Sequence, residues 1–201
     1  MVNNGYDGMR ITSNNLQDYL SPKPTENSIV LIKRHIIPSH NYLLNEIENE
    51  KLGSVITAIN ILQYFAPTMT PGILHDYIRR HGNKIGYSTK FGIIPLFNSR
   101  ILNCVATDLH IKHTFRTKYV KNIGFDFKTI TDLIDSRNPA LLSLFNDGRN
   151  YYQRHSVVIM GYEIYDVGGV QKRLLVVCDS WSKGYSYIDY DRLSSVSSLT
   201  Y

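Results

Sequence analysis

Two β-type segments separated by a glycine pair constrain the fold of this chain more than any other feature of its sequence. Residues 156–165 and 173–178 are rich in β-branched and aromatic side chains, which favour strands. Val167-Gly168-Gly169 stands between them, and a glycine pair at such a place is typical of a tight hairpin turn. The sequence therefore predicts an antiparallel β-hairpin in the last third of the chain.

The register of this hairpin brings two chemically active side chains to its open end. If the strands pair symmetrically about Gly168-Gly169, His155 lies opposite about residue 182. Asp179 is about three positions away, a shift that a β-bulge or a longer turn absorbs. A carboxylate beside an imidazole fixes the tautomer of the ring and leaves its other nitrogen free to exchange a proton. The alternative interpretation is that His155 ends a strand and Asp179 lies in a turn, without shared chemistry.

The first two thirds of the chain predict helices. From Gly53 to Phe65 the apolar side chains leave no polar face, which is typical of a buried central helix. A second helix is expected to open at Thr70-Pro71, with Thr70 as its N-cap, and to end at Gly82. A third is expected over residues 127–136, where apolar side chains recur at helical spacing.

Helices first and an antiparallel sheet last indicate an α+β domain, with the helices in one half and the sheet in the other. Residues 1–27 are polar and rich in Asn, Ser and Pro, and we expect an extended arm there, followed by a single domain over 28–201. The helical part of this domain is expected over about 50–137 and the sheet part over about 138–193. Three further short segments are expected to be strands: residues 29–32, 140–145 and 185–190.

Charge and hydropathy exclude some classes of protein. The net charge is +5, and the basic residues are not concentrated in a run. Residues 116–121 mix basic and aromatic side chains as a nucleic-acid groove would, but a solvated strand or loop face is the favoured interpretation because no nucleic-acid-binding signature accompanies them. No apolar run reaches the length of a membrane span, and residues 1–10 lack the apolar core of a signal peptide. We expect a protein that stays in the cytoplasm, or else a secreted chain trimmed to begin at Met1.

Cysteine and histidine spacings give no sign of a metal or a disulfide framework. Cys104 and Cys178 both stand among apolar residues and are expected to be buried free thiols. His110 and His113 would share a face if they were helical, but no third ligand stands in register with them. We therefore expect surface histidines and no metal or other cofactor.

The residues around the hairpin resemble a known family. Residues 155–162, His-Ser-Val-Val-Ile-Met-Gly-Tyr, and residues 176–184, Val-Val-Cys-Asp-Ser-Trp-Ser-Lys-Gly, are similar to the second half of the papain-like cysteine peptidases. The resemblance is greatest to the bacterial branch that includes the double-glycine leader peptidases. There a His heads one strand, and an Asp or Asn heads the next with Trp after it. His155, Asp179 and Trp181 stand at these positions, so the resemblance implies that Trp181 shields the His155–Asp179 contact from water.

The nucleophile of this family is missing. It is a Cys at the N-terminus of the central helix, where the helix dipole lowers the pKa of the thiol. Residues 57–65, Thr-Ala-Ile-Asn-Ile-Leu-Gln-Tyr-Phe, match the body of the family motif, and counting back puts the Cys position at Gly53, or at Ser54 with a slip of one residue. Glycine offers no nucleophile, and a serine would need a full serine-hydrolase geometry.

Two other features of the family pattern are incomplete. The Gln that donates to the oxyanion is absent, since Ile47 stands in its place, and the nearby amides of Asn45 and Asn49 are the candidates to substitute for it. Cys104 is an alternative nucleophile, but the residues after it are too polar for a buried helix. The resemblance covers roughly residues 50–193.

The resemblance implies a papain-like domain without its catalytic Cys, an inactive relative that binds a peptide or protein partner in a cleft between the two halves. The alternative is an active thiol protease whose Cys at position 53 was substituted in this chain. Its thiolate would attack, with His155 as general base and acid and Asp179 as the residue that orients it. An acyltransferase would use the same residues with an amine as acceptor. Whether the chain is an enzyme stays open at this point.

Overall fold

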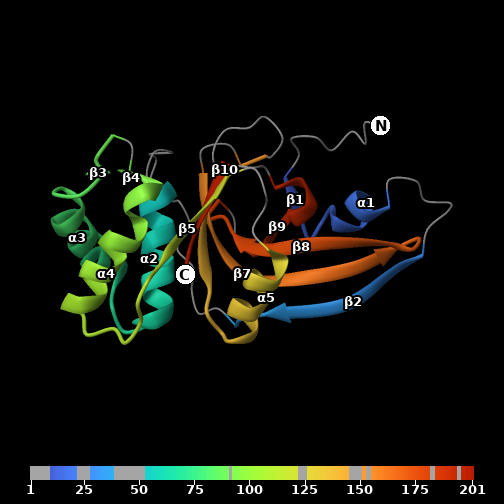
Figure 1. Ribbon diagram of the computed structural model, residues 1–201, viewed down its shortest axis with the longest axis horizontal. Helices are drawn as coiled ribbons and strands as arrows, with labels where there is room; N and C mark the ends of the chain where they lie inside the picture. Colours follow the sequence, from blue (N-terminus) through green and yellow to red (C-terminus); the bar gives the residue numbers. More distant parts are fainter. Residues whose placement is uncertain are drawn as a thin grey trace.

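Helices form one end of the molecule and an antiparallel sheet forms the other (Figure 1). The structure is a computed structural model that describes residues 10–21, 28–38, 53–90, 92–121, 126–144, 151–152, 155–181, 184–193 and 196–201. Within these residues, helices and strands are mixed and all strand pairs are antiparallel, as the α+β prediction requires.

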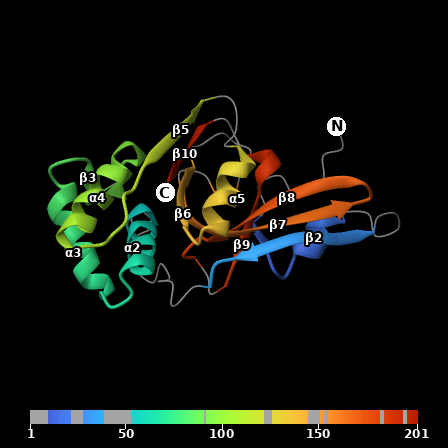
Figure 2. The same cartoon turned by 60° about the horizontal axis from the view of Figure 1, so that its bottom comes forward.

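The helical half is built around α2 (Gly53–Phe65), which lies between the sheet and the helices α3 (Pro71–Gly82) and α4 (Asn98–Asp108) (Figures 1 and 2). The prediction of a central helix apolar on all sides is confirmed, because α2 packs on both of its faces. The N-cap of α3 is also confirmed: Thr70 Oγ1 accepts a hydrogen bond from Ile73 N at 3.4 Å. A short 3-10 turn, Pro95–Phe97, leads into α4.

The large sheet has the strand order β1-β9-β8-β7-β6-β10-β5 in the described part of the chain, and β2 pairs with β7 off this path. Its strands are β1 (Ile11–Thr12), β2 (Ile29–Ile36), β5 (Thr117–Lys121), β6 (Ala140–Leu144), β7 (His155–Val167), β8 (Val170–Cys178), β9 (Ser186–Asp189) and β10 (Val196–Thr200). A separate two-stranded sheet joins β3 (Tyr87–Ser88) to β4 (Gly92–Ile93). Figure 2 shows β2, β7 and β8 extending away from the helical half.

The predicted hairpin is confirmed in β7 and β8. Gly168 and Gly169 have φ of 60° and 83°, the left-handed conformation that a two-residue hairpin turn needs and that glycine adopts without strain. Val167 pairs with Val170, and the register then shifts between Ile159 and Gly161. A bulge therefore lies near the open end of the hairpin, where the sequence suggested one.

This bulge also separates two partners of β7. β8 pairs with one edge of β7, while β6 pairs with residues 155–159 and β2 with residues 161–167. A Cβ atom at Gly161 would lie 2.5 Å from the carbonyl oxygen of His35, so glycine allows β2 to approach β7 at the point where the partners change.

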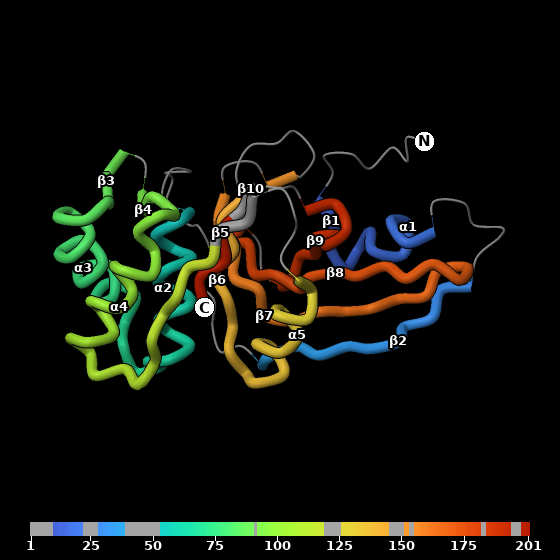
Figure 3. Tube along the Cα trace, viewed as in Figure 1, coloured from blue at the N-terminus to red at the C-terminus, as the bar shows by residue number. Residues whose placement is uncertain are grey.

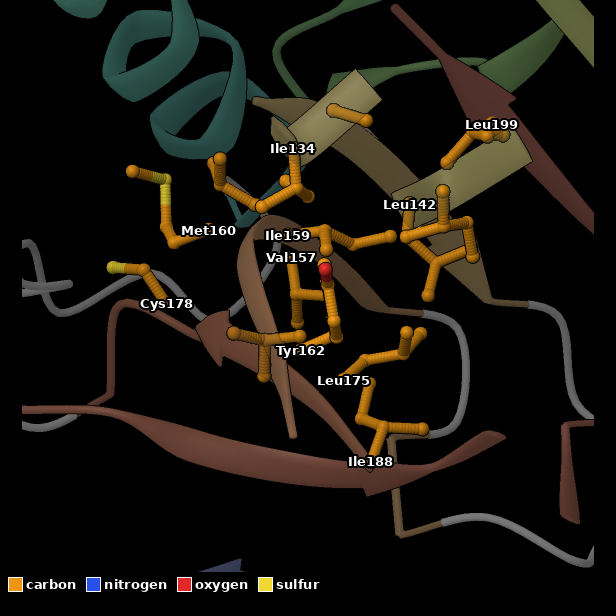
Figure 4. Packing of buried hydrophobic residues seen from close by; sticks show 14 of the residues in the cluster. Ile134, Leu142, Val157, Ile159, Met160, Tyr162, Leu175, Cys178, Ile188 and Leu199 are labelled. Carbon is orange, nitrogen blue, oxygen red and sulfur yellow. The ribbon is translucent and has the colours of Figure 1, made fainter. Parts of the chain in front are cut away.

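Side chains of the sheet form the largest core with α5 (Phe127–Asp135), which lies against β7. Figure 4 shows labelled members of this core, among them Ile134 of α5, Leu142 of β6 and Tyr162 of β7. The next residue back along β6, Leu141, belongs instead to the core of the helical half. The alternation of side chains along β6 thus joins the two cores.

Residues 10–21 differ from the extended arm that their composition suggested. β1 pairs with β9, and the short helix α1 (Leu16–Leu20) lies beside the sheet (Figure 3). Tyr19 and Leu20 of α1 are buried there. These two apolar side chains outweigh the polar composition because they pack against apolar residues of β8 and β9. The other residues of the expected arm lie outside the described ranges.

None of the described helices combines the length and the apolar character that crossing a bilayer requires.

Candidate functional site

The first residue of α2 meets the first residue of β7. A Cβ atom at Gly53 would lie 2.9 Å from Cε1 of His155 and 3.0 Å from Nδ1, closer than side chains ordinarily approach. The imidazole therefore packs directly on the backbone of Gly53, at a helix N-terminus. The structure brings together the two positions that the sequence pairs as base and missing nucleophile.

His155 is almost fully buried, with 7% of its surface exposed. Its Nε2 lies 3.1 Å from the backbone carbonyl oxygen of Asp179. A carbonyl oxygen only accepts, so Nε2 carries the hydrogen and Nδ1, the nitrogen beside Gly53, has the lone pair when the ring is neutral. Burial lowers the pKa of His155, an effect that Arg10 reinforces and that the carbonyl and the charge of Asp179 oppose. The site thus holds a neutral imidazole with its acceptor nitrogen facing residue 53.

Trp181 covers this imidazole. The two rings stack with centroids 4.2 Å apart, and Trp181 is still 42% exposed. Ser180, the residue before it, has φ of 62°, and its hydroxyl accepts from Asn60 Nδ2 of α2 at 3.0 Å. A left-handed serine is uncommon, and the bond to α2 supports it here. Trp181 thus covers one face of the His155 imidazole.

The carboxylate of Asp179 is the part of the site that differs most from the prediction. Asp179 is fully buried, and its Oδ2 accepts from Arg10 Nε at 2.7 Å and Arg10 Nη2 at 2.6 Å. Tyr152 and Ser186 donate their hydroxyls to the same oxygen at 2.7 and 2.9 Å, and the backbone N–H of Trp181 donates to Oδ1 at 3.0 Å.

His155 therefore contacts Asp179 through the main chain, and the side chain of Asp179 binds a guanidinium. The physical reason is that a fully buried carboxylate needs a compensating charge. A neutral imidazole cannot supply that charge, whereas Arg10 is always protonated.

Ser54, the slipped alternative for the nucleophile, turns to the other side of α2. Its Oγ accepts from the backbone N–H of Ile93 in β4 at 2.9 Å, so the hydroxyl is bonded to the helical half. Asn49, the candidate for the oxyanion site, lies outside the described residues, as do Asn45 and Ile47.

Thr57 joins α2 to β7 one turn beyond Gly53. Its Oγ1 lies 2.7 Å from the carbonyl oxygen of Gly53 and 2.9 Å from that of Ser156. Together with the Asn60–Ser180 bond, this contact gives Thr57 and Asn60, two polar residues of segment 57–65, a structural role. They fix the start of α2 against the strand that carries His155.

Sequence reasoning missed Arg10, Tyr152 and Ser186. Arg10 is 169 residues from Asp179 and stands in a segment that its composition marks as an arm. The one usable signal was Asp179 itself, because a carboxylate at the end of an apolar strand needs a cation from elsewhere in the chain.

The cysteines and the remaining histidines do not join this site. Cys104, expected to be buried, is only partly buried and lies within α4. Cys178 is buried as expected, and burial raises the pKa of its thiol to about 11, the opposite of an activated nucleophile. His113, expected at the surface, stacks on Phe65 with ring centroids 4.0 Å apart, and burial lowers its pKa. Since α4 ends at Asp108, His110 and His113 do not share a helix face. The described residues contain no group of three or more His, Cys, Asp or Glu that could hold a metal ion.

Chemically, the arrangement offers a buried proton acceptor at a helix N-terminus, and the residue that faces it, Gly53, has no side chain to activate. Comparison with known proteins adds no further constraint: no family model matches the chain, and no curated protein matches it. The functional interpretation therefore rests on the residues and their geometry.

Proposed function

We propose that this chain is a papain-like cysteine-peptidase domain without its nucleophile, an inactive relative that binds a peptide or protein partner. The observation that carries the proposal is the contact between Gly53 and Nδ1 of His155. In a thiol peptidase a cysteine at a helix N-terminus gives its proton to an imidazole nitrogen that faces it. Here the helix, the imidazole and the covering Trp181 are arranged in that way, and the thiol is absent.

Two features support an inactive protein over an active protease whose Cys was substituted. The imidazole occupies space that the Cβ of any side chain at residue 53 would need, which suits glycine as the native residue. The carboxylate of Asp179 binds Arg10, so it is not placed to orient the ring of His155. A working triad needs both the nucleophile and the orienting group.

Exposed apolar side chains near the site support peptide binding. Trp181 and Tyr151 meet edge to face with centroids 5.8 Å apart, and both are exposed. Exposed aromatic side chains of this kind are suited to an apolar side chain of a partner. We propose an extended peptide with a bulky apolar residue that packs on Trp181.

The test is a selection of random displayed peptides on the whole chain, followed by affinity measurement for the enriched sequences. We expect these sequences to share a bulky apolar residue and the Trp181→Ala variant to weaken binding about tenfold or more, as loss of a central aromatic contact does. Val170→Ala is the matched control, because Val170 is also an exposed apolar residue but lies at the far end of the hairpin. Its dissociation constant should equal that of the wild type. Equal losses in both variants, or no enriched peptides, would count against the proposal.

The alternative, a thiol protease or acyltransferase with a substituted Cys, is favoured by one observation: the acceptor nitrogen of His155 still faces residue 53. Mass spectrometry of the selected peptides after incubation separates the two. Intact peptides with the wild type and with Gly53→Cys support the inactive protein. Cleavage or acyl transfer by Gly53→Cys supports the alternative.

A further inference from the structure

We infer that Arg10 is a positioning residue of the candidate site, which holds the carboxylate of Asp179 away from the ring of His155. Arg10 begins the segment Arg10–Leu20, which comprises β1, the turn after it and α1 and which we call the strap. What the position of Arg10 means for activity rests on the proposed function, whereas the contacts that hold Arg10 at Asp179 do not.

The strap places Arg10 through several contacts of its own. Directly after Arg10, Ile11 and Thr12 pair with Tyr187 and Ser186 of β9. The carbonyl oxygen of Arg10 accepts from Asn15 Nδ2 at 2.9 Å, which closes the turn between β1 and α1. At the other end of the strap, the hydroxyl of Tyr19 donates to the buried carboxylate of Asp189. Arg10 is therefore held at Asp179 by backbone pairing and by a buried anchor, not by its own side chain alone.

The donors on Asp179 leave its Oδ2 without capacity for the imidazole. Two nitrogens of Arg10 and the hydroxyls of Tyr152 and Ser186 all donate to that oxygen, which has two lone pairs. Arg10 Nη2 also donates to Ser186 Oγ at 2.9 Å, so the serine is oriented by the same guanidinium. Oδ1 accepts from the backbone N–H of Trp181, and Nε2 of His155 bonds to the main-chain carbonyl oxygen of Asp179.

The charges around His155 explain why the position of the Asp179 carboxylate matters for protonation of the ring. Burial is the main cause of the lowered pKa of His155; of the charged groups, Asp179 favours the protonated ring and Arg10 disfavours it, and Tyr152 stacks beside the ring. The charge of Arg10 opposes the stabilisation that an imidazolium would receive from the carboxylate of Asp179. Loss of Arg10 should both remove a repelling charge and release the carboxylate.

The first test follows the titration of His155 by NMR in the whole chain, with the signal assigned by its absence in His155→Gln. In Arg10→Gln we expect the midpoint of His155 to move to higher pH. Arg10→Lys, which keeps the charge, should hold it near the wild-type value. Arg34→Gln is the matched control: Arg34 Nε lies 3.1 Å from Oε1 of the buried Glu163, so this variant also removes a cation from a buried acid. Its His155 midpoint should equal that of the wild type.

A folded Arg10→Gln protein with an unchanged His155 midpoint would overturn the inference, as would an equal shift in Arg34→Gln. If Arg10→Gln does not fold, Arg10→Met replaces it, because it keeps an apolar stem without the charge. A second measurement needs no variant at all. Nitrogen-15 shifts of wild-type His155 near neutral pH should show a neutral ring with hydrogen on Nε2, and hydrogen on Nδ1 would equally overturn the inference. These readouts involve no peptide, so their failure is distinct from a failure of peptide binding.

Discussion

At the scale of single residues, the site depends on the absence of a Cβ atom at Gly53. Gly53 gives the imidazole of His155 room to pack on the first turn of α2, and any Cβ there would force the ring to move. The ring is not free to do so, because Trp181 stacks on it and its Nε2 is bonded to the main chain of Asp179. The sequence could locate residue 53, His155 and Trp181 through motif spacing. It could not show that Asp179 would bind Arg10, since that pairing depends on how distant segments pack.

This crowding predicts that Gly53→Ala destabilises the fold although alanine is the better helix former. We expect a loss of about 1–3 kcal/mol in the free energy of unfolding, the usual cost of overpacking a buried site. Gly72→Ala in α3 is the matched control, because a Cβ there meets nothing within 4 Å. It should be stabilising by about 0.5–1 kcal/mol. Urea unfolding measures both, and equal stabilisation by the two variants would contradict the crowding argument.

At the scale of elements, the sequence was most informative where a strong local pattern agrees with the tertiary packing. α2, α3, α5 and the β7–β8 hairpin were predictable because apolar spacing, a proline-led cap and a glycine turn each act within a few residues. β1 and α1 were not, since they are short and owe their structure to the apolar surface of β8 and β9 beneath them. β10 pairs with both β5 and β6, and such long-range pairing has no local signature.

The junction of α2 with β7 gives a prediction at this scale. Thr57→Val removes the hydroxyl that reaches both Gly53 O and Ser156 O, and we expect a loss of about 1–3 kcal/mol in the free energy of unfolding because a buried hydrogen bond is broken. Thr107→Val in α4 is the matched control. Its hydroxyl makes the same bond to the carbonyl four residues earlier, to Asn103 O, but is exposed. Its effect should stay within about 0.5 kcal/mol, and equal losses would show that the contact with β7 contributes nothing.

At the scale of the whole molecule, the helical half and the sheet half share residues instead of meeting as separate bodies. α2 packs on α3 and α4 with one face and on β7 with the other, and Leu141 of β6 belongs to the helical core. The sheet core cannot open fully without exposing α2, and α2 cannot leave without exposing the sheet. Shared burial of this kind favours one cooperative unfolding transition over two.

The single tryptophan allows a direct test of that cooperativity. Trp181 stacks on His155 at the junction, so its fluorescence reports the contact between the halves, whereas far-UV circular dichroism is dominated by the helices. We expect both signals to change at the same urea concentration and with the same slope, because a shared core makes partial unfolding costly. Trp181→Phe, which should lose the fluorescence signal and keep the dichroism transition, checks the origin of the signal. Loss of helical signal at clearly lower urea than the fluorescence change would instead mean that α3 and α4 unfold on their own, with α2 held by the sheet.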